Sequence, residues 1–193
     1  MTTQTRMGEN RYVALLRGIN VGGNNLIKML DLRSSFASMG FSDVQTYIQS
    51  GNVVFSSKQT NKPKLTALIE KALSDAFSYE SRVVVISGVE MERVVTQAPK
   101  GFGKDPELYR YDVLFVREPF TTAEALNAIN TTPGVDTAHA GDHALYFRRL
   151  ISKAAQSNLN KLGVRPAYKN ITVRNWNTTM KLLGMIRSAS NTV

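Results

Sequence analysis

The chain has 193 residues, enough for one large domain or two small ones. Hydrophobic residues make up 42% of it and charged residues 20%, a composition that excludes a wholly disordered protein. It contains no cysteine, which excludes disulfides, thiolate metal sites and cysteine nucleophiles. No apolar run approaches the roughly 20 residues that a membrane span requires, and the polar start lacks the apolar core of a secretory signal. We therefore expect a cytoplasmic protein that contacts no membrane.

The first half of the chain predicts the order strand, helix, strand, strand, helix, strand, followed by a short helix. Short apolar or β-branched runs indicate the strands, and apolar residues at helical spacing indicate the helices. A glycine-rich loop over 18–25 separates the first strand from the first helix. The expected elements are strand 12–16, helix 26–39, hairpin strands 44–48 and 53–55, helix 63–77, strand 82–86 and helix 90–97.

The second half repeats this order. Thr121 or Thr122 can cap its first helix, and Gly163 follows its second. The expected elements are strand 111–116, a helix ending at Ile129, hairpin strands 137–139 and 144–147, helix 152–162, strand 169–173 and helix 175–186.

Two βαββαβ patterns in one chain predict an α+β protein of two ferredoxin-like subdomains, followed by a C-terminal helix. A stretch rich in proline and glycine separates the two patterns. The expected boundaries are a flexible extension over 1–10, a first subdomain over 11–98, a connector over 99–108 and a second subdomain over 109–193.

Positive charge is concentrated toward the end of the chain. Lys and Arg number 24 against 15 Asp and Glu, a net charge of +9, and Asp142 is the last acidic residue. One interpretation is a face that attracts phosphate or nucleic acid. The other is an ordinary solvated surface, because the basic residues are singly spaced and few aromatic residues lie among them.

The glycine-rich loop is the first candidate site. In a βαββαβ fold the first and third strands are antiparallel neighbours, so this loop lies beside the turn at 50–52. Glycine backbones and a following helix N-terminus favour an anion, although Asn24 and Asn25 stand where a P-loop requires Lys and Ser or Thr. The alternative is a tight structural turn with asparagine as a cap. The candidate ligand-binding residues here are Arg17, Gly18, Asn20, Gly22, Gly23, Lys28, Ser50 and Asn52.

A second polar cluster, Arg174, Asn175 and Trp176, joins the last strand to the last helix. Trp176 can stack on a ring while Arg174 holds a phosphate or carboxylate. Alternatively, Asn175 caps the helix and Trp176, the only tryptophan, fills the core. Both interpretations stay open at this stage.

The sequence displays no catalytic set. No serine lies in a nucleophile elbow and no carboxylate pair stands out. His139 and His143 flank a predicted turn, but no third ligand has suitable spacing, so we expect neither a metal nor a cofactor.

Three stretches, YVALLRGINVGGNNLIKM, LRSSFASMGFSDVQTYIQSGNVVFSS and ITVRNWNTTMKL, resemble the bacterial family known as domain of unknown function 1697. The resemblance implies a cytosolic bacterial protein of two α+β subdomains related by pseudo-twofold symmetry, and it implies no activity. Family members often carry Lys where this chain has Asn24. The family motif carries over onto Arg17, Gly18, Asn20, Gly22, Gly23, Lys28, Met29, Gln49, Ser50, Gly51, Asn52, Arg174, Asn175, Trp176 and Thr178.

These observations favour a binding module for an anionic ligand, either a nucleotide-like small molecule or a nucleic acid. An enzyme acting on a phosphorylated or carboxylated small molecule is the first alternative, and it requires an acid, base or metal. A structural or protein-interaction domain, in which the loops are only turns, is the second.

Overall fold

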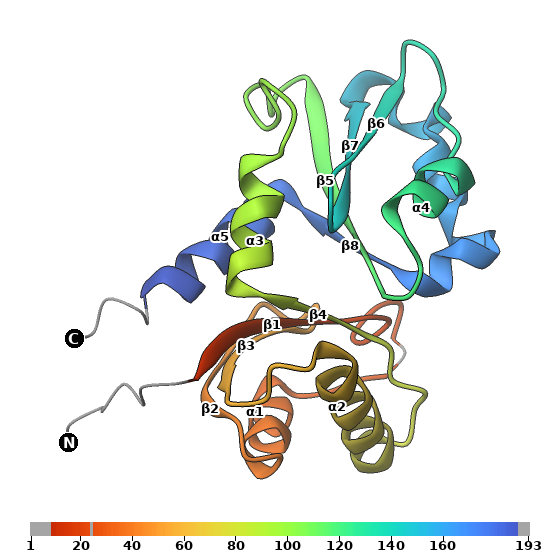
Figure 1. The fold of residues 1–193 in the computed structure, drawn as a ribbon. Helices are drawn as coiled ribbons and strands as arrows, with labels where there is room; N and C mark the ends of the chain where they lie inside the picture. Colours follow the sequence, from red (N-terminus) through yellow and green to blue (C-terminus); the bar gives the residue numbers. More distant parts are fainter. Residues whose placement is uncertain (1–8, 24, 189–193) are drawn as a thin grey trace. The chain divides into compact units, whose positions relative to one another are not determined.

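The computed structural model describes residues 9–23 and 25–188, and the chain forms two compact units (Figure 1). Unit 1 comprises Met1–Met91 and Lys181–Val193, and unit 2 comprises Glu92–Met180. The boundaries expected at residues 98 and 109 both fall inside unit 2. Of the expected extension over 1–10, residues 1–8 lie outside the described residues, whereas Asn10 begins the first strand.

Unit 1 is a four-stranded antiparallel sheet with two helices on one face (Figure 1). The strand order is β2-β3-β1-β4, with β1 in antiparallel pairing to both β3 and β4. Apolar side chains of the sheet and of both helices form one core. The elements are β1 (Asn10–Leu16), α1 (Met29–Ser38), β2 (Ser42–Tyr47), β3 (Asn52–Ser57), α2 (Lys62–Phe77) and β4 (Val83–Ser87).

The first helix is shorter than the sequence predicts. It begins at Met29 rather than at Leu26, because both backbone polar groups of Ile27 bond to the side chain of Asn20 and hold that residue in the loop. The helix expected over 26–39 rests on apolar residues at helical spacing, which include Leu26 and Leu30, but the exposed fractions of these two are 77% and 72%. That part of the expectation was wrong.

Helix α3 (Gly88–Thr96) begins in unit 1 with a reciprocal cap. The amide of Glu90 donates to Ser87 Oγ (3.3 Å), and the Glu90 carboxylate accepts from the amide and the hydroxyl of Ser87 (2.8 and 2.9 Å). Lys62 Nζ donates to the same carboxylate. Burial raises the pKa of Glu90, but the hydrogen bonds from Lys62 and Ser87 outweigh burial and hold the pKa below its usual value.

Unit 2 repeats the same sheet topology. Its strand order is β6-β7-β5-β8, again with the first strand between the third and fourth in antiparallel pairing. The side chain of Thr121 caps α4 in a capping box with Glu124. The elements are β5 (Tyr109–Val116), α4 (Thr122–Ala128), β6 (Asp136–Ala140), β7 (Ala144–Leu150) and β8 (Ile171–Asn175), and α5 (Trp176–Ser188) continues from unit 2 into unit 1. Two four-stranded antiparallel sheets with flanking helices confirm the expected α+β class and the two ferredoxin-like subdomains.

The helix expected over 152–162 is not an α-helix. Three short 3-10 helices take its place: η1 (Ile151–Gln156), η2 (Asn158–Val164) and η3 (Pro166–Asn170). Ser157 is extended and its hydroxyl accepts from the amide of Leu159, while Asn158 donates its amide to the Asp136 carboxylate (3.0 Å). Such side-chain bonds compete with the helical backbone pattern. Arg165 is extended as well, as expected for a residue that precedes proline.

Aromatic side chains pack together in unit 2. The ring of Phe102, in the stretch expected as a connector, makes edge-to-face contacts with Tyr111, Tyr146 and Trp176 at centroid distances of 4.9, 5.5 and 5.2 Å. The hydroxyl of Tyr146 donates to the carbonyl of Val94, near the end of α3 (2.6 Å). The stretch over 99–108 is therefore packed within unit 2. Within the described residues, no helix is long and apolar enough to cross a membrane.

The cap of α3 generates a pH prediction. Because the pKa of Glu90 is lowered in the folded state, its charge stabilises the fold above about pH 4.3, the ordinary value of an unfolded glutamate, and the contribution is lost as the pH falls through the folded pKa. Glu90→Gln should lower the free energy of unfolding by about 2 kcal/mol at pH 7. The difference between the variant and the unmodified protein should shrink below pH 4. Denaturant titrations at several pH values measure this difference.

The control is Glu80→Gln, which removes a carboxylate from the exposed pair with Arg82 and should cost less than about 0.5 kcal/mol. Equal costs for the two variants at pH 7, or a Glu90→Gln cost that does not change with pH, would contradict the prediction.

Candidate functional site

The glycine-rich loop of unit 1 lies against the hairpin turn between β2 and β3, as the topology predicted. Two backbone bonds fix the point at which it leaves β1. The amide of Leu16 donates to the carbonyl of Gly51 (2.8 Å), and the amide of Arg17 donates to the carbonyl of Arg82 (3.0 Å). The loop and the turn therefore form one continuous piece of structure at the end of the sheet.

Asn20 connects three parts of this region through its side chain. Its amide nitrogen donates to the carbonyls of Ile27 (2.9 Å) and Gln49 (2.8 Å), and its amide oxygen accepts from the backbone N–H of Ile27 (2.8 Å). Its φ of +53° lies in the left-handed region, which asparagine tolerates better than most residues. Both donor hydrogens of this amide are therefore engaged by the protein itself.

Gly51 and Asn52 shape the neighbouring turn. A Cβ at Gly51, where φ is +75°, would lie 2.7 Å from Leu16 Cβ and 2.8 Å from Ile19 Cδ1, so only glycine fits. Asn52 is fully buried and donates its side-chain amide to the carbonyl of Tyr47 (2.9 Å) and to Ser50 Oγ (3.1 Å). Asn20 and Asn52 thus position the loop and the turn.

The loop exposes a different set of groups. Gly18, Gly22, Gly23 and Lys28 are exposed, and Arg17 is half-buried, whereas Asn24 lies outside the described residues. Positive φ angles occur at Gly18, Asn20, Gly22, Gly23 and Asn25. The loop therefore presents glycine backbone and positive charge to solvent.

Helix α1, which follows this loop, has no side-chain cap: Lys28 stands at its N-cap position and makes no capping hydrogen bond. The N-termini of the other α-helices differ, since side chains of Asn61, Ser87, Thr121 and Asn175 accept from the first turns of α2, α3, α4 and α5. Helix N-terminal N–H groups favour negative charge. The N-cap side chain of α1 therefore leaves the first-turn N–H groups uncapped, and Asp31 is the acidic residue of that turn.

Three exposed apolar side chains border the same loop. Val21, Leu26 and Ile48 have exposed fractions of 63%, 77% and 49%. Val21 follows Asn20, Leu26 precedes Ile27 and Ile48 precedes Gln49. Because Asn20 bonds to Ile27 and Gln49, the three apolar residues lie in one region. Sequence reasoning missed them because Leu26 and Ile48 were assigned to the apolar faces of a helix and a strand. Val21, an apolar residue inside the polar loop between Asn20 and the glycine pair, was the signal that the sequence offered.

In the second candidate cluster, in unit 2, Asn175 caps α5 by accepting from the amide of Thr178 (2.7 Å). Arg174 is only 9% exposed, and its Nη1 donates to the carbonyl of Val173 (2.9 Å). Burial lowers the pKa of Arg174 to about 10, while Tyr168 acts in the opposite direction, so the guanidinium remains charged at neutral pH.

Trp176 is half-buried against the stretch over 99–108. Its ring meets Phe102 edge to face, and a Cβ at Gly103 would overlap its Cδ1 and Nε1 atoms. Asn175 thus caps a helix and Trp176 packs against neighbouring residues, as the structural interpretation of this cluster expected. The eight loop and turn candidates belong to unit 1, and Arg174, Asn175 and Trp176 belong to unit 2.

Metal-ligating side chains do not cluster in the part of the chain that the structure describes: no three of His, Cys, Asp and Glu are placed to hold an ion there.

The close contact at Gly103 predicts a measurable cost. Gly103→Ala should destabilise the protein by about 1–3 kcal/mol more than Gly101→Ala, because the added methyl group must displace Trp176. Gly101 is the matched control, since its φ of +83° is close to the +86° of Gly103 but a Cβ there meets no atom within 4 Å. Chemical denaturation followed by the fluorescence of Trp176 measures both; equal costs would refute the packing contact.

The hydrogen bonds of Asn20 generate a second prediction. Asn20→Gly keeps the left-handed backbone accessible but removes three hydrogen bonds, and it should cost about 2–3 kcal/mol. Asn25→Gly is the control, because Asn25 has a similar φ of +47° and its side chain donates one bond, to the carbonyl of Gly18. It should cost about 1 kcal/mol or less. Urea unfolding of both variants tests this, and a cost for Asn25→Gly as large as for Asn20→Gly would contradict it.

The chain is similar to known proteins in sequence and in fold. Its residues 9–146 match the family model described as protein of unknown function, DUF1697. Its fold is similar to the structure of the conserved bacterial protein SP0830 from Streptococcus pneumoniae, with a TM-score of 0.82 and 26% sequence identity over 92% of this chain and 99% of that chain. No curated protein matches it significantly. Because the family model spans more than two thirds of the sequence and the ferredoxin-like repeats agree with the expected fold, the chain belongs to the DUF1697 family.

Proposed function

We propose that the protein binds an anionic, nucleotide-like small molecule at the glycine-rich loop of unit 1. The observation that carries the proposal is the uncapped N-terminus of α1, preceded by the exposed pair Gly22–Gly23. A phosphate group can accept from helix N-terminal N–H groups where glycine lets the backbone approach closely. Lys28, exposed at the N-cap position, adds a positive charge.

The hydrogen bonds of Asn20 support the proposal by fixing the loop before a ligand arrives. They tie the loop both to the start of α1 and to the hairpin turn. A loop that is already ordered costs less conformational entropy on binding. In this proposal Asn20 and Asn52 are positioning residues, and the backbone of Gly22 and Gly23 with Lys28 contacts the ligand.

The exposed Val21, Leu26 and Ile48 favour a ligand with an apolar part beside its charge, such as a nucleoside carrying phosphate. A single-stranded nucleic acid is the less favoured occupant. Such ligands use aromatic side chains as stacking platforms, and the segment over 17–28 contains no aromatic residue. We place this function in the cytosol, in keeping with the family resemblance.

A nucleoside diphosphate should raise the melting temperature of the full chain and bind in a titration calorimeter. Lys28→Gln should weaken binding about tenfold, the loss of one charge-assisted hydrogen bond. Lys58→Gln is the control, because Lys58 is an exposed lysine beyond the opposite end of β3 from the loop, and it should leave affinity unchanged.

Inorganic phosphate and a single-stranded oligonucleotide complete the panel. Phosphate should bind more weakly than the diphosphate, because it lacks the apolar part. Oligonucleotide binding that falls steeply with salt, without diphosphate binding, would replace the proposal with the nucleic-acid alternative. Absence of diphosphate binding, or equal affinity in Lys28→Gln and Lys58→Gln, would refute the site.

A further inference from the structure

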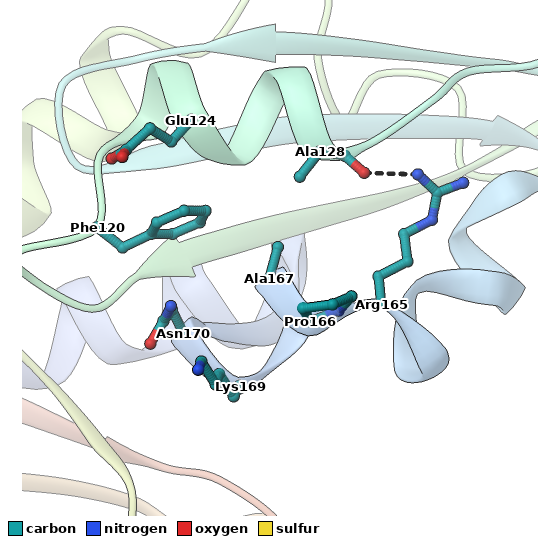
Figure 2. A pocket seen from close by; sticks show the side chains of 8 residues that line it. All are labelled: Phe120, Glu124, Ala128, Arg165, Pro166, Ala167, Lys169 and Asn170. Atoms are coloured by element: carbon teal, nitrogen blue, oxygen red, sulfur yellow. Dashed lines mark hydrogen bonds between the residues drawn. The ribbon is translucent and has the colours of Figure 1, made fainter.

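A hollow of about 480 Å³ lies in unit 2, between α4 and η3 (Figure 2). In unit 1, α1 and α2 cover the equivalent face of the sheet and contact each other. In unit 2 the three 3-10 helices take the place of the second of these helices. The hollow follows from this replacement, and the sequence did not single it out.

The walls of the hollow are mainly apolar. Phe120 and Ala128 contribute from the α4 side, and Pro166 and Ala167 contribute from the η3 side (Figure 2). Its volume falls within the range of about 300–1,000 Å³ that is usual for small-molecule pockets. An apolar group the size of an aromatic ring with a short chain fits this space.

The charged groups around the hollow favour one negative charge in the ligand. Arg165 Nη1 donates to the carbonyl of Ala128 (2.6 Å), which holds the guanidinium at one end, and Lys169 lies exposed at the rim. Glu124 also lines the hollow, but its carboxylate accepts from the amide and hydroxyl of Thr121 in the capping box. Two cations, one carboxylate and the side-chain amide of Asn170 therefore line the hollow, and the carboxylate already accepts two hydrogen bonds.

We propose that this hollow binds a monocarboxylate with an apolar, ring-sized body. The body packs against Phe120, Pro166 and Ala167, and the carboxylate lies toward Arg165 and Lys169. A phosphate-rich ligand fits less well, because most of the lining offers no hydrogen-bond donor. The site belongs wholly to unit 2 and does not depend on the function proposed for the loop of unit 1.

The probe is 3-phenylpropionate, titrated into the full chain and followed by amide chemical shifts. Saturable shifts should occur at Ala128, Ala167 and Lys169. Ala128→Leu should fill the space and weaken binding more than tenfold, whereas Ala123→Leu, which adds the same bulk at an exposed position of α4 outside the lining, should bind as the unmodified protein does.

A second comparison tests whether binding requires the negative charge of the ligand. The neutral amide, 3-phenylpropanamide, should bind about fivefold more weakly than the carboxylate, and Lys169→Gln should weaken the carboxylate about fivefold without affecting the amide. Shifts that do not saturate, unchanged binding in Ala128→Leu, or equal affinity for carboxylate and amide would overturn the proposal. Lys28→Gln should leave this binding intact, which separates this test from that of the loop.

Discussion

The candidate site of unit 1 depends on the side-chain amide of one residue, Asn20. Its three hydrogen bonds hold the end of β1, the entry to α1 and the β2–β3 turn together. Asn20 has left-handed backbone, and Ile27 and Gln49 lie outside the helices and strands. Without this amide, the polar groups of Ile27 and Gln49 would need other partners, and the glycine pair would lose its fixed support.

Polar residues of the recognisable motifs mainly satisfy backbone groups. Asn20 and Asn52 bond to carbonyls of the loop and turn, and Asn175 accepts from the first turn of α5. These are sites where the chain changes direction and leaves backbone groups unpaired, and a short amide side chain is suited to pairing them. A motif rich in asparagine and glycine can therefore be distinctive because of its backbone geometry alone.

The two units show how one topology accommodates different coverings. Both sheets place the first strand between the third and fourth, but unit 1 is covered by the long helix α2 and unit 2 by short 3-10 helices. Shorter, broken elements fill less of the space above a sheet than a continuous helix does. The amphipathic hollow lined by Phe120 and Arg165 lies where the 3-10 helices replace the second helix. A hollow of similar size in unit 1 lies elsewhere, beside the end of α1 and the start of α2.

The sequence by itself determined the order of the strands, the α+β class and the two repeats, because strand and helix periodicities are local properties of the chain. It also placed the glycine-rich loop beside the turn at Ser50, since strand adjacency follows from the topology. Only the tertiary structure decided that Asn20 and Asn52 use their amides internally, that Leu26 is exposed, and that 152–162 is not an α-helix. Those outcomes depend on hydrogen bonds between residues distant in sequence, such as Asn20 with Gln49 and Asp136 with Asn158, which no local pattern encodes.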